Sequence, residues 1–150
     1  MNKKILISLL LLILVILLVF IYQNIKNKPF YLEDKYYVNE IIEIDSKEYS
    51  ELVKKKESFA VALYKPNCGA SSAFLEVLNE FSSNYKISIY KMTFEEMKKT
   101  KLKIKYYPSL ALINKGRLVD YLESDKDSDI KYYKTSEGFN EWFRMHVLVK

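Results

Sequence analysis

An unbroken apolar segment opens the chain. Residues 5–22 read ILISLLLLILVILLVFIY, in which Ser8 is the only clearly polar side chain. A helix over these residues is about 27 Å long, at about 1.5 Å per residue, which is close to the hydrocarbon thickness of a bilayer. A buried core helix in so small a protein is rarely apolar on every face. The pattern therefore predicts a transmembrane helix over residues 5–22, preceded by a short tail over residues 1–4.

This segment is predicted to stay attached as a signal anchor. A cleavable signal peptide has a shorter apolar region that ends in small residues, whereas no Ala, Gly or Ser occurs between Leu9 and Tyr37. Two lysines precede the segment and two follow it closely. The four-residue tail favours an inside N-terminus, because long downstream domains cross the membrane largely regardless of their charge. We therefore expect a single-pass membrane protein with its domain outside the cytoplasm; a domain on the cytoplasmic face is the alternative.

Residues 23–39 form a juxtamembrane connector between this helix and the rest of the chain. The connector lacks the Gly and Ser content of a flexible linker. Its aromatic side chains are expected to pack either at the membrane interface or on the folded domain.

From residue 40 onwards the pattern alternates between strand and helix signals. Residues 59–64 form a continuous apolar run of six, which is typical of a central strand buried on both faces. Asp45 followed by Glu48 matches a capping box that opens a helix, and two β runs around residues 114–116 indicate a hairpin. The order βαβαβαββα predicts one α/β domain with a mixed sheet over residues 40–150. Predicted strands cover about 40–44, 59–64, 87–92, 110–113 and 117–121; predicted helices cover about 45–56, 68–81, 94–101 and 136–147.

The charge of the chain argues against nucleic acid as a partner. The formal net charge is +5, and 22 basic and 19 acidic residues remain once the two lysines of the tail are set aside. The lysines are interspersed with acids and form no stripe, so we expect no nucleic-acid binding. A weak attraction to an anionic membrane surface is compatible with this balance.

Cys68, the only cysteine, lies between a predicted strand and a predicted helix. At the first turn of a helix the unpaired N–H groups and the helix dipole favour the thiolate, which is the nucleophilic form. Ser71, one turn further on, can donate a hydrogen bond to that thiolate. A lone thiol can attack a disulfide, but its release then needs an external thiol. The alternative is an inert cysteine that is kept by packing alone.

Three segments resemble the thioredoxin family over about residues 40–148. Residues 41–53 (IIEIDSKEYSELV) resemble its first strand and helix, residues 59–72 (FAVALYKPNCGASS) its active-site strand, loop and helix, and residues 103–122 (KIKYYPSLALINKGRLVDYL) its cis-proline segment and final hairpin. The resemblance implies a thioredoxin-like fold, a mixed central sheet flanked by helices. It also implies a thiol–disulfide oxidoreductase or a peptide-binding relative of one.

The same resemblance assigns roles to individual residues. Cys68 stands at the position of the nucleophilic cysteine and Ser71 at that of the resolving cysteine. Pro108 stands at the cis-proline, where it would face the sulfur and leave nearby backbone free to pair with an extended peptide. The implied catalytic residues are Cys68 and Ser71, and the implied substrate-binding residues are Asn67, Gly69, Tyr107, Pro108 and Ser109.

Three positions depart from the family pattern. Asn67 replaces the Trp that usually precedes the first cysteine, and Ala62 replaces a buried acid that accepts the proton of the resolving thiol. Lys91 matches a lysine that commonly accompanies that acid, so its usual partner is missing. Because position 71 carries no thiol, nothing there needs to be deprotonated.

No metal or cofactor is predicted. Asp125, Asp127 and Asp129 alternate like the start of a calcium loop, but Ile130 stands where the loop requires glycine. The only histidine, His146, lies among apolar residues of the last helix, so neither a zinc site nor a Cys–His pair is supported.

The sequence thus predicts a membrane-anchored thioredoxin-like protein. Cys68 would exchange with thiols or disulfides of partner proteins, presented as extended peptide segments. The alternative is a non-catalytic thioredoxin-fold module that binds a protein at the membrane surface, which the departures at Ala62, Asn67 and Ser71 motivate.

Overall fold

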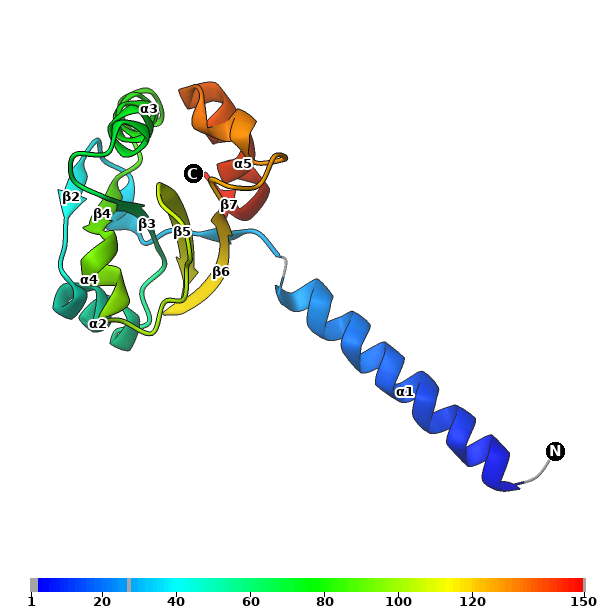
Figure 1. The fold of residues 1–150 in the computed structure, drawn as a ribbon. Helices are drawn as coiled ribbons and strands as arrows, with labels where there is room; N and C mark the ends of the chain where they lie inside the picture. Colours follow the sequence, from blue (N-terminus) through cyan, green and yellow to red (C-terminus); the bar gives the residue numbers. More distant parts are fainter. Residues whose placement is uncertain (1–2, 27, 150) are drawn as a thin grey trace.

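The computed structural model describes the backbone of residues 3–26 and 28–149, and the side chains of residues 5–21 and 28–149. The predicted N-terminal helix is present as α1 (Lys3–Lys26), which extends away from the rest of the molecule (Figure 1). Within the residues so described, no helix is both long enough and apolar enough to cross a membrane. Residues 1 and 2 of the predicted tail and residue 27 of the predicted connector lie outside the described residues.

A five-stranded mixed sheet forms the centre of the domain, as predicted. Its strand order is β2-β4-β3-β5-β6, with β4 parallel to both of its neighbours and β5 antiparallel to both of its own. The central strand β3 is buried along residues 59–63, as its apolar run predicts. The strands are β2 (Ile41–Glu43), β3 (Phe59–Tyr64), β4 (Ile89–Thr93), β5 (Ser109–Asn114) and β6 (Arg117–Leu122).

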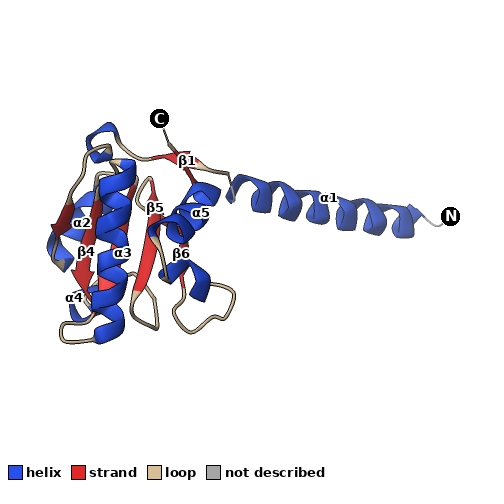
Figure 2. Cartoon of the chain, turned by 90° about the horizontal axis from the view of Figure 1, so that it is seen from above, coloured by secondary structure: helices blue, strands red, loops and turns tan. Residues whose placement is uncertain are grey.

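Helices cover both faces of this sheet (Figures 1 and 2). Helices α3 and α5 lie on one face, and α2 and α4 lie on the other. Phe59 of β3 packs edge-on against Tyr49 of α2, with ring centroids 5.9 Å apart. On the opposite face, Phe81 of α3 packs against Phe139 of α5 at 4.7 Å. The helices are α2 (Ser46–Lys54), α3 (Gly69–Tyr85), α4 (Phe94–Lys98) and α5 (Ser136–His146), with 3-10 turns η1 (Asp34–Tyr36) and η2 (Ile130–Tyr133).

The capping box predicted for α2 is present. The Asp45 carboxylate accepts the backbone N–H groups of Lys47 and Glu48, and the Glu48 carboxylate accepts the N–H of Asp45 at 2.9 Å. Helix α3 continues past the predicted end near Phe81 and stops at Tyr85. The following Lys86 has a left-handed backbone conformation, which terminates the helix.

The connector is part of the folded domain, which therefore extends beyond the boundary predicted at residue 40. Strand β1 (Phe30–Tyr31) pairs in parallel with β7 (Val147–Leu148), a two-stranded ribbon that the sequence pattern does not predict. Phe30, Leu32 and Tyr36 are buried against the core. Of the two expected placements for the connector aromatics, packing on the domain is the one observed for Phe30 and Tyr36.

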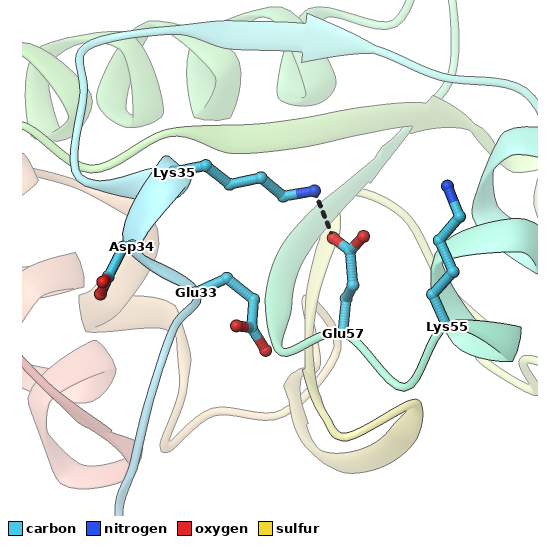
Figure 3. A pocket seen from close by; sticks show the side chains of 5 residues that line it. All are labelled: Glu33, Asp34, Lys35, Lys55 and Glu57. Atoms are coloured by element: carbon cyan, nitrogen blue, oxygen red, sulfur yellow. Dashed lines mark ion pairs between the residues drawn. The ribbon is translucent and has the colours of Figure 1, made fainter.

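Charged side chains also bind the connector to the domain. Glu57 accepts a hydrogen bond from the Tyr36 hydroxyl at 2.6 Å and forms an ion pair with Lys35, also at 2.6 Å (Figure 3). Burial of Glu57 opposes its ionisation, but the Lys35 ammonium and the Tyr36 hydroxyl outweigh burial and lower the pKa of this carboxyl. The recess around this pair measures about 400 Å³ and is lined by Glu33, Asp34, Lys35, Lys55 and Glu57.

The hairpin turn between β5 and β6 requires glycine at position 116. Gly116 has φ +74°, in the left-handed region, and its N–H donates to the Glu57 carbonyl at 2.9 Å. A Cβ atom there would collide with the backbone carbonyl of Val53. Both the conformation and the close approach therefore disfavour any other residue.

We expect Gly116→Ala to lower the free energy of unfolding by about 1–3 kcal/mol, because it adds strain in both ways. Gly69→Ala is the matched control, since a Cβ at this helical glycine meets nothing within 4 Å. The control should be neutral or stabilising by about 0.4–1 kcal/mol. Denaturant titration of the full chain, followed by the fluorescence of Trp142, measures both; equal losses would contradict the argument.

Candidate functional site

Cys68 caps the N-terminus of α3 directly after the turn that follows β3. The residues of the turn, 65–67, are exposed, and Asn67 adopts φ +59°. A left-handed conformation is several-fold enriched in Asn, so the sequence suits the turn. Cys68 itself is extended, half-buried and a free thiol. Its sulfur therefore lies at the positive end of a helix of 17 residues.

The surroundings of Cys68 favour the thiolate. The backbone N–H of Ser71 makes the largest contribution that lowers the pKa of the Cys68 thiol, followed by the Ser71 hydroxyl. Slight burial opposes this effect, whereas the N–H of Ala70 and the charge of Lys65 add to it. The pKa of Cys68 is thus held below its ordinary value by donors that the fold already positions.

Ser71 is held in place for this role. Its side chain is 1% exposed, and its hydroxyl oxygen accepts the backbone N–H of Lys65 at 3.1 Å. Because the oxygen accepts that N–H, the hydroxyl proton remains available for the sulfur one turn earlier. The serine thus ties the loop to the helix and supports the thiolate.

Pro108 forms the second side of the site. The Tyr107–Pro108 peptide bond is cis, as the resemblance predicts. The Tyr133 hydroxyl donates to the Pro108 carbonyl at 3.0 Å. The Tyr107 ring packs against Phe94, with centroids 4.9 Å apart, and the Lys65 ammonium lies 5.4 Å from the centre of the same ring.

A pocket joins this second side to the active-site helix. It measures about 260 Å³ and is called the Pro108 pocket below. Two alanines of the first turns of α3 face Pro108 across it, so the proline lies beside the segment that begins with Cys68. The residues that line it are Ala70, Ala73, Phe74, Pro108, Ser124, Ile130 and Tyr133.

The remaining predicted binding residues differ in accessibility. Asn67 and Gly69 are exposed and Tyr107 is half-buried. Ser109 is fully buried, and its hydroxyl donates to the Tyr106 carbonyl at 2.8 Å. Its side chain therefore stabilises the start of β5 and is not exposed for contact with a partner segment.

Sequence reasoning did not include Tyr133, Ser124 or Ile130 in the site. These residues fall in the stretch 123–135, which the polar pattern predicts only as irregular. The helical turn η2 within it brings Tyr133 to the carbonyl of Pro108. The available signal was the group Ile130, Tyr132 and Tyr133, which are apolar or aromatic side chains in an otherwise polar loop.

Lys91 pairs with an acid on another strand, whereas the partner predicted to be missing, an acid at position 62, is absent. Ala62 is buried beside Lys91 in the β3–β4 register, but the Lys91 ammonium lies 3.2 Å from Glu43 of β2. The Tyr64 hydroxyl donates to the same carboxylate at 2.6 Å. Tyr64 first and Lys91 second lower the pKa of Glu43. The carboxylate that pairs with Lys91 therefore comes from β2, and no acid occupies position 62.

Metal ligands do not gather in the described part of the chain, where no three His, Cys, Asp or Glu side chains are placed to hold an ion. His146 instead lies 3.2 Å from Asp120, and burial lowers its pKa.

We expect Ser71→Ala to raise the pKa of Cys68, because it removes the hydroxyl that supports the thiolate. The rate of alkylation of Cys68 as a function of pH reports this pKa directly, since the chain has no other cysteine. Ser72→Ala is the control, because Ser72 is exposed and is not among the groups that lower the pKa of Cys68. Identical profiles for Ser71→Ala and the unsubstituted chain would refute the role of Ser71.

A family model described as Thioredoxin matches residues 40–135. The fold is similar to the short form of thioredoxin F from spinach chloroplast, with a TM-score of 0.55 and 15% identity over 72% of this chain and 94% of that chain. Thioredoxin O1 from Arabidopsis thaliana, in its oxidized state, gives a TM-score of 0.50 and 20% identity over 62% of this chain and 93% of that chain.

A third similar structure is a chain in the complex of ferredoxin:thioredoxin reductase with thioredoxin f2, with a TM-score of 0.51 and 19% identity over 63% of this chain and 91% of that chain. A comparison with curated proteins finds no match. At these identities the structural likeness establishes the fold. The family model covers more than half of the chain, and the chain therefore belongs to the thioredoxin family.

Proposed function

We propose that this protein carries out thiol–disulfide exchange with partner proteins through Cys68 alone, from a position at a membrane. The observation that carries the proposal is the arrangement of the thiol. Cys68 caps the N-terminus of α3 with a lowered pKa, and Ala70 and Ala73 of the same helix face the cis-proline Pro108 across one pocket.

The exchange proceeds in two steps. The Cys68 thiolate attacks one sulfur of a partner disulfide, a bond forms between the two sulfurs, and the other partner sulfur leaves as a thiolate that takes a proton from water. A second thiolate, from the partner or from a small thiol in solution, then attacks the partner sulfur and releases Cys68. The protein ends in its starting redox state, so this cycle rearranges disulfides or transfers them to the attacking thiol.

The absence of a resolving thiol limits this chemistry. Ser71 occupies the position that would otherwise break the mixed disulfide from within, and Ala62 offers no carboxylate to assist it. The mixed disulfide therefore persists until an outside thiol arrives. Long-lived adducts with partners are the expected signature of such a site.

The backbone beside Pro108 is suited to an extended partner segment. The β3–β5 ladder ends at the pair Leu63–Ser109, so Tyr107 lies beyond it. An extended peptide can add along such a free stretch of backbone and bring its own sulfur to Cys68.

The membrane part of the proposal rests on the apolar segment. The run of residues 5–22 continues past the last described side chain of α1, Ile21. The large apolar side chains between Ile5 and Ile21 are 42–64% exposed, and lipid tails would cover them. We place the N-terminus inside and the domain outside the cytoplasm, because a long domain after a membrane helix crosses the membrane largely regardless of its charge.

Helix α3 sets the distance between the thiol and this anchor. Tyr85 and Lys86, at its C-terminal end, share a recess with Tyr37 of the connector. The Tyr37 hydroxyl also donates to the Leu148 carbonyl of the β1–β7 ribbon at 3.2 Å. Cys68 lies at the other end, about 25 Å away along a helix of 17 residues. The thiol therefore faces away from the point where the anchor joins the domain, toward water-exposed partner segments.

Cys68→Ala should abolish adducts with partner proteins on non-reducing gels of cells that carry the tagged full chain. A thiol elsewhere on α3 provides the control. The double variant Cys68→Ala/Asn79→Cys carries one exposed cysteine, more than two helical turns beyond the N-terminus of α3. Adducts specific to the wild type support exchange at the site. Their complete absence under oxidising and reducing growth would overturn exchange in favour of a non-catalytic binding module.

Val15→Arg should release the chain from membranes during alkaline extraction, because a charge at the centre of a transmembrane helix costs about 2.5–3.5 kcal/mol. Val15→Leu is the control and should remain in the membrane fraction. Protease added outside intact cells should digest the domain of the wild type. Extraction of the wild type itself, or protection of its domain until lysis, would contradict the anchor and the orientation respectively.

A further inference from the structure

The β1–β7 ribbon has an apolar face that points away from the core. Phe30 and Val147 are register partners and are buried, at 8% and 1% exposure, whereas Tyr31 and Leu148 are register partners and are 53% and 40% exposed. Because side chains alternate along a strand, the first pair faces the core and the second pair faces outward. Two large side chains thus lie side by side on the outside of the domain, and this pair, Tyr31 and Leu148, is called the ribbon face below.

The ribbon face has a fixed position on the domain. Its inner pair is buried in the core, and the Tyr37 hydroxyl donates to the Leu148 carbonyl at 3.2 Å. Val149, the next residue of the chain, shares a recess of about 380 Å³ with Tyr37 and with Tyr85 at the C-terminal end of α3. The Pro108 pocket is lined by the N-terminal turns of the same helix. The ribbon face and the site around Cys68 therefore lie at opposite ends of α3.

The ribbon begins close to the end of α1 (Figure 2). The apolar run ends at residue 22, and residues 23–26 extend the helix by about 6 Å beyond it. The chain from Lys26 to Phe30 then spans at most about 14 Å, at about 3.3–3.6 Å per residue. Each headgroup layer is about 5–8 Å thick, since a bilayer of about 40–45 Å has a hydrocarbon core of about 30 Å. A helix anchored in a bilayer therefore brings the ribbon within reach of the headgroups.

The side chains of the ribbon suit a lipid surface. Tyrosine is enriched at membrane–water interfaces, where its ring lies at the level of the headgroups. Leu148 beside it adds apolar area, and Lys28, which is exposed just before β1, carries a charge that lipid phosphates attract. Two exposed side chains are too few to hold a second copy of the chain, because a stable interface buries roughly 800 Å² on each partner. A lipid surface needs no such area here, since the anchor already holds the ribbon beside it.

We infer that the ribbon face is a second membrane contact, in which Tyr31 and Leu148 enter the headgroup layer beside the end of α1. The inference rests on the proposed membrane anchor and states how the anchored domain sits on the bilayer. With the ribbon in the headgroups, the domain is held at two neighbouring points instead of hanging from one. Helix α3 then sets a single height for Cys68 above the lipid surface.

The depth of the ribbon face can be measured on the full chain in vesicles of phosphatidylcholine and phosphatidylglycerol. The double variant Cys68→Ala/Leu148→Cys carries a nitroxide label on the ribbon face. The control is Cys68→Ala/Ile130→Cys, because Ile130 is 41% exposed, as much as Leu148, but lines the Pro108 pocket. The label at position 148 should collide with dissolved oxygen more than with a water-soluble nickel complex, because oxygen concentrates in lipid. The label at position 130 should show the opposite preference.

The height of Cys68 gives a second measurement. Cys68 is the only cysteine, so a fluorescent donor attached to it reports energy transfer to an acceptor lipid in the same vesicles. Tyr31→Ser/Leu148→Ser should lower the transfer, because the domain then also occupies greater heights above the bilayer. Tyr31→Trp/Leu148→Met keeps two large side chains of interfacial and apolar character and should retain the wild-type transfer.

The outcomes separate the inference from the anchor. If the wild-type chain floats with the vesicles but the label at position 148 is as accessible to nickel as the label at position 130, the anchor stands and the inference is overturned. If the chain does not float, both are wrong. A shielded label at position 148 that shows dipolar broadening, removed by dilution with unlabelled chain, would assign the ribbon face to a second copy and overturn the lipid contact. None of these results depends on whether Cys68 exchanges disulfides.

Discussion

The burial of β3 at the centre of the sheet is the constraint on which the site depends. Its residues 59–63 are at most 1% exposed, between the parallel β4 and the antiparallel β5. Because side chains alternate along a strand, Phe59 packs toward α2 while Ala60 and Ala62 face the side of α3. The small alanines allow α3 to lie close to the sheet. The strand end thereby fixes the turn of residues 65–67 and places Cys68 at the helix N-terminus.

The site lacks both a second thiol at position 71 and a buried acid at position 62. An acid at position 62 would be buried, and a buried ionised carboxylate costs free energy of folding. Because position 71 carries no thiol, such an acid would have no proton to accept there. The chain has alanine there, and its acid is Glu43 on β2, where the carboxylate is 55% exposed and paired with Lys91. Stabilisation of the thiolate does not need that acid, because it comes from the helix N-terminus and Ser71. The features that favour the thiolate are thus present, whereas the second thiol that internal resolution needs is absent.

Local signals predicted most of the fold, and non-local contacts account for what they missed. The capping box at Asp45 and the apolar run of β3 depend on neighbours in sequence, so both were confirmed. The β1–β7 ribbon joins pairs of residues more than a hundred positions apart, and two residues give no periodicity to detect. The Lys91 partner lies on β2, adjacent in the sheet order but distant in sequence. The role of Tyr133 likewise exists only through its bond to Pro108.

The folded connector changes what a membrane anchor would mean for this protein. A flexible linker of this length would let the thiol sample many heights above a bilayer. Here the chain enters the domain at Phe30, where β1 pairs with β7, so only residues 27–29 separate the end of α1 from the core. The distance from that entry to Cys68 is then set by α3, a rigid element of about 25 Å. An anchored thiol of this kind would meet only disulfides held at a matching height, so geometry alone would restrict its partners.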